Sequence, residues 1–319
     1  MDDVFETAPE DANAVFLKDV LEGLAQPQKT LPCRYFYDEA GSNLFEQITE
    51  LPEYYPTRTE RGILTNNVDQ IAAALGPNTL LVEYGAGAST KTRILLDALD
   101  DMAGYVPIDV SEAFLLQTAE QLRQDYPALR VHPIVGDFMV RFGLPANIIG
   151  APAGFFPGST IGNLSDADIT AFMHAARALL GDTGKFLIGV DLRKSEEILV
   201  PAYDDAAGVT AAFNLNLLKR INRDLDATFD VDEFAHRAFW NDQASRIEMH
   251  LESLIDQSVR IGHEDIEFAA GETIHTENSR KFALEALLPL FQQTGWRLET
   301  EWRDEQDYFA VVLLHATSA

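Results

Sequence analysis

The chain lacks the features of disulfide-bonded, membrane-spanning and secreted proteins. Its 319 residues include one cysteine, Cys33, which excludes an internal disulfide and a cluster of cysteine ligands. No apolar run reaches the roughly 18 residues that a spanning helix needs. The first residues, MDDVFETAPEDAN, are acidic, whereas a secretory signal begins with a basic segment. We therefore expect a cytoplasmic protein.

Basic residues are also scarce. The chain has 24 Lys and Arg against 51 Asp and Glu, a formal charge of −27. Such a charge repels phosphate backbones and anionic lipids, so we expect neither a nucleic-acid nor a membrane partner. The 7 histidines form no H-x-H or H-x-x-x-H pair, and no metal site is predicted. The expectation is a monomer that acts on a small molecule.

Residues 57–192 alternate short apolar runs with helix-length segments. Thr57 and Glu60 predict a capping box for the first helix, and Ser165 with Asp168 predicts another helix start. Runs of this kind suit strands that are buried on both faces of a parallel sheet. The runs are TLLVEYG (79–85), YVPIDV (105–110), RVHPIVGDF (130–138), GFFPGS (154–159) and KFLIGVDL (185–192).

The alternation stops after Asp191. Residues 201–225 predict a helix, and RIEMHLESL (246–254) alternates apolar and polar residues, as in an antiparallel strand with one solvated face. FALEALLPLFQQTGW then predicts a helix, and RLETEWR with DYFAVVLLHA predicts a closing hairpin. These patterns define a sheet domain, residues 57–192 and 281–319, and a second domain, residues 1–56 and 193–280.

Five parallel strands and a terminal hairpin resemble the seven-stranded, Rossmann-like α/β sheet of class I methyltransferases that use S-adenosylmethionine. The second domain would then be a discontinuous α+β substrate-binding domain. A nicotinamide-binding sheet would instead close with another parallel strand.

The candidate cofactor residues follow the first three strands. Gly85 and Gly87, in LVEYGAGASTKT (81–92), let the backbone approach a ligand at a helix N-terminus. The fingerprint G-x-G-x-x-G would need glycine where Thr90 stands, which favours a cofactor without pyrophosphate. Asp109 ends the second strand, where an acid accepts ribose hydroxyls.

Asp137 and Phe138, at the end of the third strand, resemble the pair that brackets an adenine. Each acid alone is equally well explained as a turn or cap residue. Three consecutive strand ends that carry the right residue type favour the cofactor.

The chain resembles the ergothioneine-pathway L-histidine Nα-methyltransferases over nearly its whole length. Three of the matching segments lie outside the general methyltransferase core. The segments are YFYDEAGSNLFEQITELPEYYPTRTE (35–60), VEYGAGASTKTRILLDAL (82–99), GSTIGNL (158–164), AYDDAAGVTAAFNLNLL (202–218), RIEMHL (246–251) and TENSRKF (276–282).

The resemblance implies the site residues. S-adenosylmethionine, with S-adenosylhomocysteine as product, would be held by Gly85, Lys91, Asp109, Asp137 and Phe138, with Tyr37 and Phe45 near its reactive end. Asn163 and Tyr203 would grip the carboxylate and amine of the amino acid. The imidazole would contact Tyr54, Met249, Glu277 and Ser279. Tyr37, Asn163 and Tyr203 would be the catalytic residues, and the proton acceptor, a tyrosine oxygen or a water, stays open.

Each of these residues also has an ordinary structural explanation, such as a helix cap for Asn163 or a core position for Met249. Pro157 and Asn278 depart from the histidine-specific motifs and match the wider family, which includes tryptophan-type enzymes. The implied function is up to three methyl transfers to histidine, giving hercynine. Two alternatives remain: methylation of another amino acid or amine, and a cofactor-binding protein without turnover.

Overall fold

The computed structural model describes residues 12–140 and 142–317. The acidic start of the chain lies almost wholly outside them. Contacts divide the chain into a core unit, Tyr55–Ser195 with Ser279–Ala319, and a second unit, Met1–Tyr54 with Glu196–Asn278. Within the described ranges, no helix is long and apolar enough to cross a membrane.

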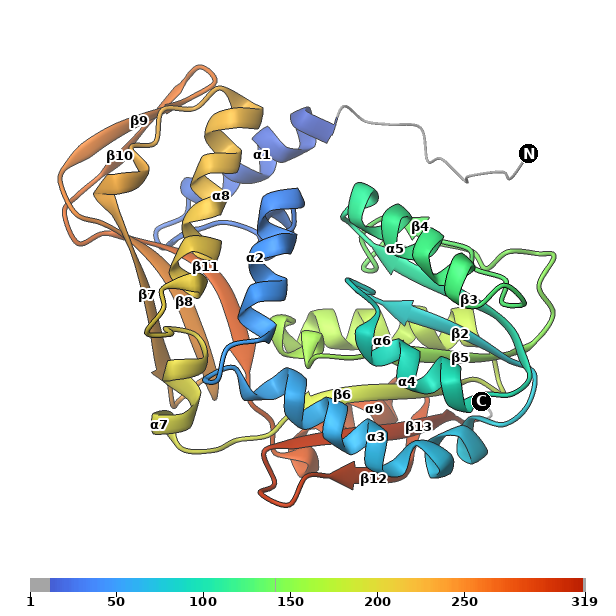
Figure 1. Ribbon diagram of the computed structural model, residues 1–319. Helices are drawn as coiled ribbons and strands as arrows, with labels where there is room; N and C mark the ends of the chain where they lie inside the picture. Colours follow the sequence, from blue (N-terminus) through green and yellow to red (C-terminus); the bar gives the residue numbers. More distant parts are fainter. Residues whose placement is uncertain (1–11, 141, 318–319) are drawn as a thin grey trace. The chain divides into compact units, whose positions relative to one another are not determined.

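The core unit is built on a seven-stranded sheet in the order β12-β13-β6-β5-β2-β3-β4. β2 to β6 run parallel, and β13 is antiparallel to both β6 and β12 (Figure 1). The predicted fold is therefore confirmed, closing hairpin included. The strands are β2 (Thr79–Tyr84), β3 (Met102–Asp109), β4 (Ile134–Val135), β5 (Ala151–Phe156), β6 (Lys185–Asp191), β12 (Trp296–Arg303) and β13 (Phe309–Ala316).

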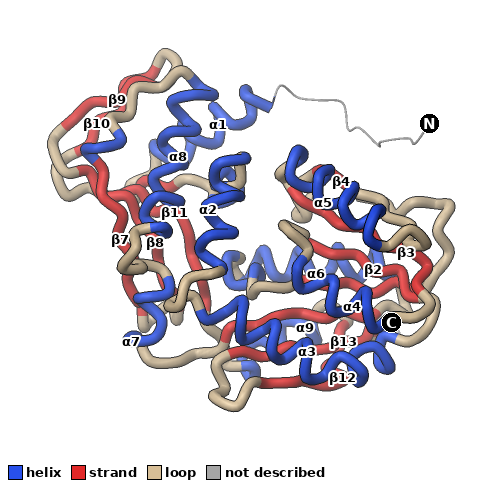
Figure 2. Tube along the Cα trace, in the orientation of Figure 1, coloured by secondary structure: helices blue, strands red, loops and turns tan. Residues whose placement is uncertain are grey.

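Helices cover both faces of this sheet (Figure 2). One face packs against α3, α4 and α5 through residues such as Ile63, Leu95 and Leu122. The other face packs against α6 and α9 through residues such as Phe172 and Phe291. The helices are α3 (Tyr55–Leu75), α4 (Thr90–Ala98), α5 (Glu112–Asp125), α6 (Asp166–Leu180) and α9 (Leu284–Gln293).

The second unit combines a four-stranded sheet, ordered β1-β11-β8-β7, with a two-stranded ribbon, β10-β9. Its strands are β1 (Lys29–Thr30), β7 (Phe234–Asn241), β8 (Arg246–Ser253), β9 (Gln257–Ile261), β10 (Glu264–Phe268) and β11 (Thr273–Arg280). Its helices are α1 (Ala12–Leu24), α2 (Glu39–Thr49), α7 (Glu196–Leu199) and α8 (Val209–Leu225).

Two local predictions in the core unit are wrong. α3 begins at Tyr55, so Thr57 lies inside its first turn, and Glu60 is a buried residue within the helix. The strand expected over residues 130–138 is reduced to Ile134–Val135 and a single bridge at Val131. Pro133 has no N–H to donate between them. The capping box at Ser165 is confirmed.

Two further predictions fail in the second unit. The helix expected from residue 201 begins at Val209, because Gly208 has a φ of 74° and the Asp205 carboxylate accepts from the N–H of Val209 at 3.0 Å. The polar side of β8 is not solvated: Glu248 and His250 are 7% and 5% exposed. Hydrogen bonds to neighbouring side chains replace the expected water.

Candidate functional site

The loop between β2 and α4 leaves open space beside its backbone. Gly85 and Gly87 have φ values of 72° and 50°, and a Cβ on either would meet no atom within 4 Å. The N–H of Gly85 donates to Ile108 O at 2.9 Å, and that of Gly87 donates to Asp109 Oδ2 at 3.0 Å. The loop is thus fixed to the end of β3 with room for a ligand next to the glycines.

Asp109 lies at the end of β3, as predicted. Its carboxylate accepts from the N–H of Gly87 and, at 2.9 Å, from that of Ser111. Burial raises the pKa of Asp109, and the backbone N–H groups partly offset this shift. A carboxylate has about four acceptor positions, so two backbone donors leave capacity for ribose hydroxyls.

Asp137 and Phe138 follow β4. Asp137 Oδ1 accepts from the N–H of Met139 at 2.9 Å. The Phe138 ring packs against Phe156 and Phe172, with centroids 5.2 and 5.6 Å apart. Because the ring is engaged in this cluster, the backbone is the part of Phe138 best suited to bracket an adenine.

Glu83 belongs to the interior. Its side chain accepts from Thr92 Oγ1 at 2.6 Å and from the Tyr105 hydroxyl, and the residue is 1% exposed. Burial raises the pKa of Glu83 to about 8. The side chain therefore ties β2 to α4 and β3 and is not directed at a ligand.

Lys91 is paired with Glu60, the residue whose spacing from Thr57 predicts a capping box. Lys91 Nζ lies 2.5 Å from Glu60 Oε2, and the N–H of Gly158 donates to the same oxygen at 2.9 Å. The Glu60 side chain is fully buried. One carboxylate thus fixes both the predicted cofactor lysine and the loop after β5.

That loop carries Asn163 and has the expected form: β5 ends at Phe156, and a 3-10 turn covers Thr160–Asn163. Ser159 accepts from the N–H of Asp191 at 2.9 Å. A Cβ on Gly162 would lie 2.9 Å from Arg280 O. Glycine is therefore required for the turn to approach Arg280, which ends β11 and directly follows Ser279.

A buried charge network holds Ser279. Lys281 Nζ donates to Ser279 Oγ at 2.8 Å and to Asp191 Oδ2 at 2.7 Å. Asp191 also accepts from the Tyr55 hydroxyl at 2.7 Å and from Lys194 at 2.5 Å. Burial lowers the pKa of Lys194 to about 8. The sequence signal for this network was Asp191, an acid that ends a buried strand as Asp109 does.

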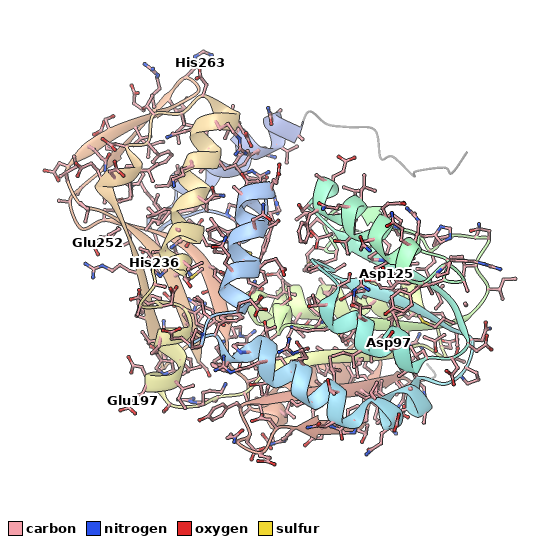
Figure 3. All side chains as sticks on the ribbon, viewed as in Figure 1. Asp97, Asp125, Glu197, His236, Glu252 and His263 are labelled. Carbon is pink, nitrogen blue, oxygen red and sulfur yellow. The ribbon has the colours of Figure 1, made fainter. Side chains whose placement is uncertain are left out.

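In the second unit, the predicted aromatic residues lie together. The ring centroids of Tyr37 and Phe45 are 5.8 Å apart, those of Phe45 and Tyr54 6.3 Å, and those of Tyr54 and Tyr203 6.1 Å. His236 of β7, which Figure 3 labels, donates through Nε2 to the backbone oxygen of Tyr203 at 2.8 Å. Tyr37, Phe45, Tyr54 and Tyr203, from the segments 35–60 and 202–218, thus form one aromatic cluster.

Met249 and Glu277 lie on adjacent strands. Met249 is 2% exposed on β8, and its backbone oxygen accepts from Thr276 Oγ1 of β11 at 3.0 Å. The backbone oxygen of Glu277 accepts from His275 Nε2 at 3.1 Å. The structure therefore places Met249 beside the residue that precedes Glu277.

One polar cluster was not predicted. Glu248, His250 and His275 each bring a ligand atom within 4.8 Å of the others. The two imidazoles stack with centroids 4.6 Å apart and planes 3° from parallel. Ring lone pairs lie in the ring plane, so parallel rings do not converge on one ion, and Arg246 Nε lies 2.7 Å from Glu248. We assign no metal to this cluster.

The seven-stranded α/β sheet that closes with the antiparallel β12-β13 hairpin, with a glycine loop and strand-end acids at its carboxyl edge, is the fold of class I S-adenosylmethionine-dependent methyltransferases. The chain is similar to the crystal structure of an S-adenosylmethionine-dependent methyltransferase from Clostridium acetobutylicum, with a TM-score of 0.52, 11% identity and coverage of 86% and 99% of the two chains. Residues 16–316 match the family of SAM-dependent, histidine-specific methyltransferases. The chain belongs to this family.

Two curated relatives cover nearly the whole chain. It is 43% identical to a histidine N-alpha-methyltransferase of Mycolicibacterium smegmatis, over 96% of both chains. It is 27% identical to a 4-dimethylallyltryptophan N-methyltransferase of Epichloe festucae var. lolii, over 90% of both chains. The wider family therefore includes enzymes with different amine substrates.

Proposed function

We propose that this protein transfers methyl groups from S-adenosylmethionine to the α-amino group of L-histidine. Up to three transfers give Nα,Nα,Nα-trimethylhistidine, hercynine, for ergothioneine biosynthesis. The observation that carries this proposal is the match to the histidine-specific family over residues 16–316, together with the full-length similarity to a histidine N-alpha-methyltransferase.

The carboxyl edge of the large sheet fits the cofactor. The open backbone at Gly85 and Gly87 gives room for it, and Asp109 keeps acceptor capacity for hydroxyls. Asp137, Phe138 and Lys91 would complete this part of the site. S-adenosylmethionine, when bound, supplies a methyl group activated by its sulfonium.

The amino acid would be held through both of its ends. Asn163 and Tyr203 would bind the carboxylate and amine, while Tyr54, Met249, Glu277 and Ser279 would contact the ring. A lysine ammonium group can only donate hydrogen bonds, so Ser279 Oγ is the acceptor in its contact with Lys281. The hydroxyl proton of Ser279 therefore points away from Lys281. A serine donor and a glutamate acceptor together match one neutral imidazole.

Methyl transfer to nitrogen needs a neutral amine about 3 Å from the methyl carbon and in line with the carbon–sulfur bond, so positioning supplies most of the catalysis. Asn163 and Tyr203 would provide this positioning. Tyr37, or a water beside it, would accept the proton that the amine loses. The aromatic faces around Tyr37 tolerate the methylated amine, because they make no demand for an N–H donor.

A panel of free amino acids tests the proposal. We expect histidine to give the highest kcat/KM and Glu277→Gln to raise KM for histidine more than it lowers kcat. Glu252→Gln, a change on the same sheet that the proposal gives no role, is the matched control. Faster transfer to tryptophan would favour the other-amine alternative, and cofactor binding without any product would favour a protein without turnover.

We further propose that the enzyme is a cytoplasmic monomer, in keeping with its charge of −27. Light scattering at micromolar concentration would give the mass of one chain; twice that mass would contradict a monomer.

A further inference from the structure

A buried asparagine of the second unit uses its amide nitrogen for two contacts. Asn214, in α8, is 0% exposed, and its Nδ2 lies 3.0 Å from the backbone oxygen of His250 in β8. The same Nδ2 lies 2.9 Å from His236 Nδ1 in β7. A carbonyl oxygen can only accept hydrogen bonds, so the amide must direct its nitrogen, and not its oxygen, at His250 and hence also at His236.

The contacts of His236 determine which ring nitrogen carries the hydrogen. Nε2 lies 2.8 Å from the backbone oxygen of Tyr203, so Nε2 must be an N–H donor. Nδ1 faces an N–H of Asn214 and must be the acceptor. A neutral imidazole with its hydrogen on Nε2 satisfies both contacts, and hydrogen bonds then run from Asn214 through His236 to Tyr203.

The same arrangement disfavours the charged form of His236. A proton on Nδ1 would point at the N–H of Asn214, and turning the amide round would place its oxygen against His250 O, which is also an acceptor. Burial lowers the pKa of His236, and the carboxylates of Asp204 and Asp205 oppose this shift only in part. The ring is therefore neutral at neutral pH.

Asn214 leaves one polar atom without a partner. Its Oδ1 is buried and has no hydrogen-bond partner among the described residues. Leucine has nearly the same shape and would fill this position without an unpaired acceptor. Packing alone therefore does not explain an asparagine between α8 and the sheet, whereas the hydrogen bonds of its N–H groups do.

The backbone of Tyr203 is held at both of its polar atoms. Tyr203 follows the 3-10 turn Val200–Ala202, and its N–H donates to Val200 O at 2.9 Å while its carbonyl oxygen accepts from His236. The residue is 9% exposed, and its ring lies 6.1 Å from that of Tyr54. The direction of the Tyr203 side chain thus depends on the contact with His236.

We propose that His236 is a positioning residue for the amino-acid substrate. As a neutral imidazole held by Asn214, it fixes the backbone of Tyr203 and so directs the tyrosine side chain at the amino acid. The inference rests on the proposed function, in which Tyr203 binds the carboxylate or amine. His236 acts through Tyr203 and takes no part in the methyl transfer itself.

Two measurements on the full-length protein test this role. In ¹⁵N NMR at neutral pH, His236, assigned by its absence from His236→Gln, should carry its hydrogen on Nε2. Calorimetry with S-adenosylhomocysteine bound should show about tenfold weaker histidine binding for His236→Leu, which leaves the Tyr203 oxygen unpaired. KM should rise in parallel, while kcat and the affinity for S-adenosylhomocysteine change less. His236→Gln keeps an N–H for Tyr203 O and should restore most of the affinity.

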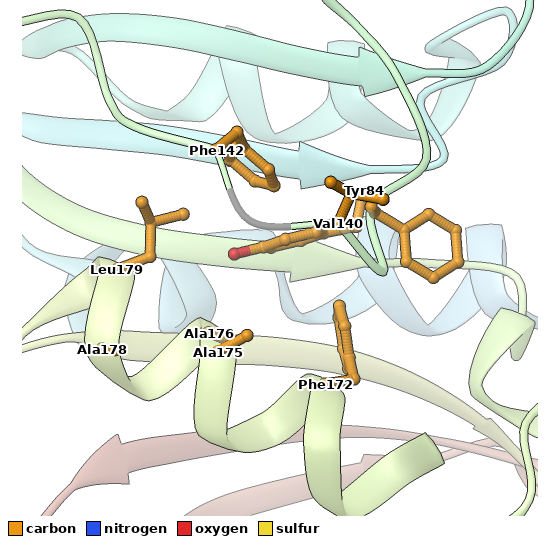
Figure 4. Close-up of a pocket in the computed structure, with 9 residues that line it drawn as sticks. Tyr84, Val140, Phe142, Phe172, Ala175, Ala176, Ala178 and Leu179 are labelled. Carbon is orange, nitrogen blue, oxygen red and sulfur yellow. The ribbon is translucent and has the colours of Figure 1, made fainter. Parts of the chain in front are cut away.

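A double-mutant cycle separates this role from a purely structural one. Asn214→Leu alone should weaken histidine binding, and in a His236→Leu background it should weaken it no further, because Asn214 acts through His236. His263→Gln changes an exposed histidine between β9 and β10 (Figure 3) and is the matched control. Leu179→Ala, in the apolar core beside α6 (Figure 4), lowers the stability of the core unit. Neither control should change KM.

The outcomes distinguish this inference from the proposed function. A hydrogen on Nδ1, unchanged histidine binding by His236→Leu, or full additivity in the cycle would overturn the role of His236. If wild type methylates another amine instead of histidine, the proposed substrate is wrong, and the same comparisons made with that amine decide on His236. A wild type that binds no amino acid would overturn both.

Discussion

Replacing Glu60 by glutamine should weaken both the fold and the cofactor site. The change removes the charge that pairs with Lys91 and keeps an oxygen for the N–H of Gly158. Removing one member of a buried ion pair costs about 3–5 kcal/mol. The Lys91 side chain is 14% exposed and regains some water, so we expect about 2–3 kcal/mol, at or below the lower end of that range.

The effect on the cofactor follows from the same contact. Without the Glu60 charge, Lys91 Nζ is no longer held in place, and the affinity for S-adenosylmethionine should fall about tenfold, or about 1.4 kcal/mol. Urea unfolding gives the first quantity and calorimetric titration gives the second. Adding Lys91→Met to Glu60→Gln completes a double-mutant cycle, in which we expect a coupling of about 1 kcal/mol or more.

The reasoning is refuted if Glu60→Gln unfolds at the wild-type urea concentration and binds the cofactor with wild-type affinity. A cycle with no coupling energy would also contradict it. Either result would mean that the ion pair between Glu60 of α3 and Lys91 of α4 contributes no more than an exposed salt bridge does.

Three other changes give distinct outcomes. Asp191→Asn leaves the buried ammonium groups of Lys281 and Lys194 without a carboxylate, so urea unfolding should show a loss of about 3–5 kcal/mol, larger than for Lys281→Met; the reverse order would contradict this. The folded-state pKa of Glu83, about 8, exceeds the unfolded value of 4.5, so its stabilisation is complete below pH 4.5 and is lost as the pH rises to 8. Between pH 4.5 and 8, Glu83→Gln should reduce the pH dependence of the unfolding free energy by up to about 1.4 kcal/mol per pH unit. Parallel curves of unfolding free energy against pH for wild type and variant would contradict this role of Glu83. Gly162→Ala brings a Cβ within 2.9 Å of a backbone oxygen and should cost about 1–3 kcal/mol and weaken histidine binding; unchanged binding would count against the placement of Asn163.

The strands of the large sheet could be predicted because burial on both faces leaves a continuous apolar run in the sequence. The exception is the run over residues 130–138, where Pro133 interrupts the pairing. The capping box at Ser165 could be predicted because both partners lie within one turn. In local patterns of this kind, the interacting residues lie within a few positions of one another in the sequence.

The partners of the missed residues lie far away in the sequence. Glu60 follows Thr57 at capping-box spacing, yet it contacts Lys91 and Gly158, which are 31 and 98 residues away. The prediction that the polar side of β8 is solvated fails for the same reason, because His250 stacks on His275 of another strand. Periodicity in the sequence gives no information about contacts between residues so far apart along the chain.

The candidate site was predictable to different extents. Gly85 and Asp109 follow from their places at strand ends, and the structure gives the space and the hydrogen bonds that such a site needs. The roles of Tyr54 and Tyr203 came from resemblance, since nothing local distinguishes them from other tyrosines. Lys281, which donates to Ser279, carried no sequence signal, because it follows the polar stretch TENSR (276–280) as one more basic residue.

The most direct test is to react histidine with S-adenosylmethionine and to locate the added methyl groups by tandem mass spectrometry. The account predicts a product with up to three methyl groups, all on the α-nitrogen. Methyl groups on the imidazole, or a histidine left unchanged while another amine is methylated, would contradict it.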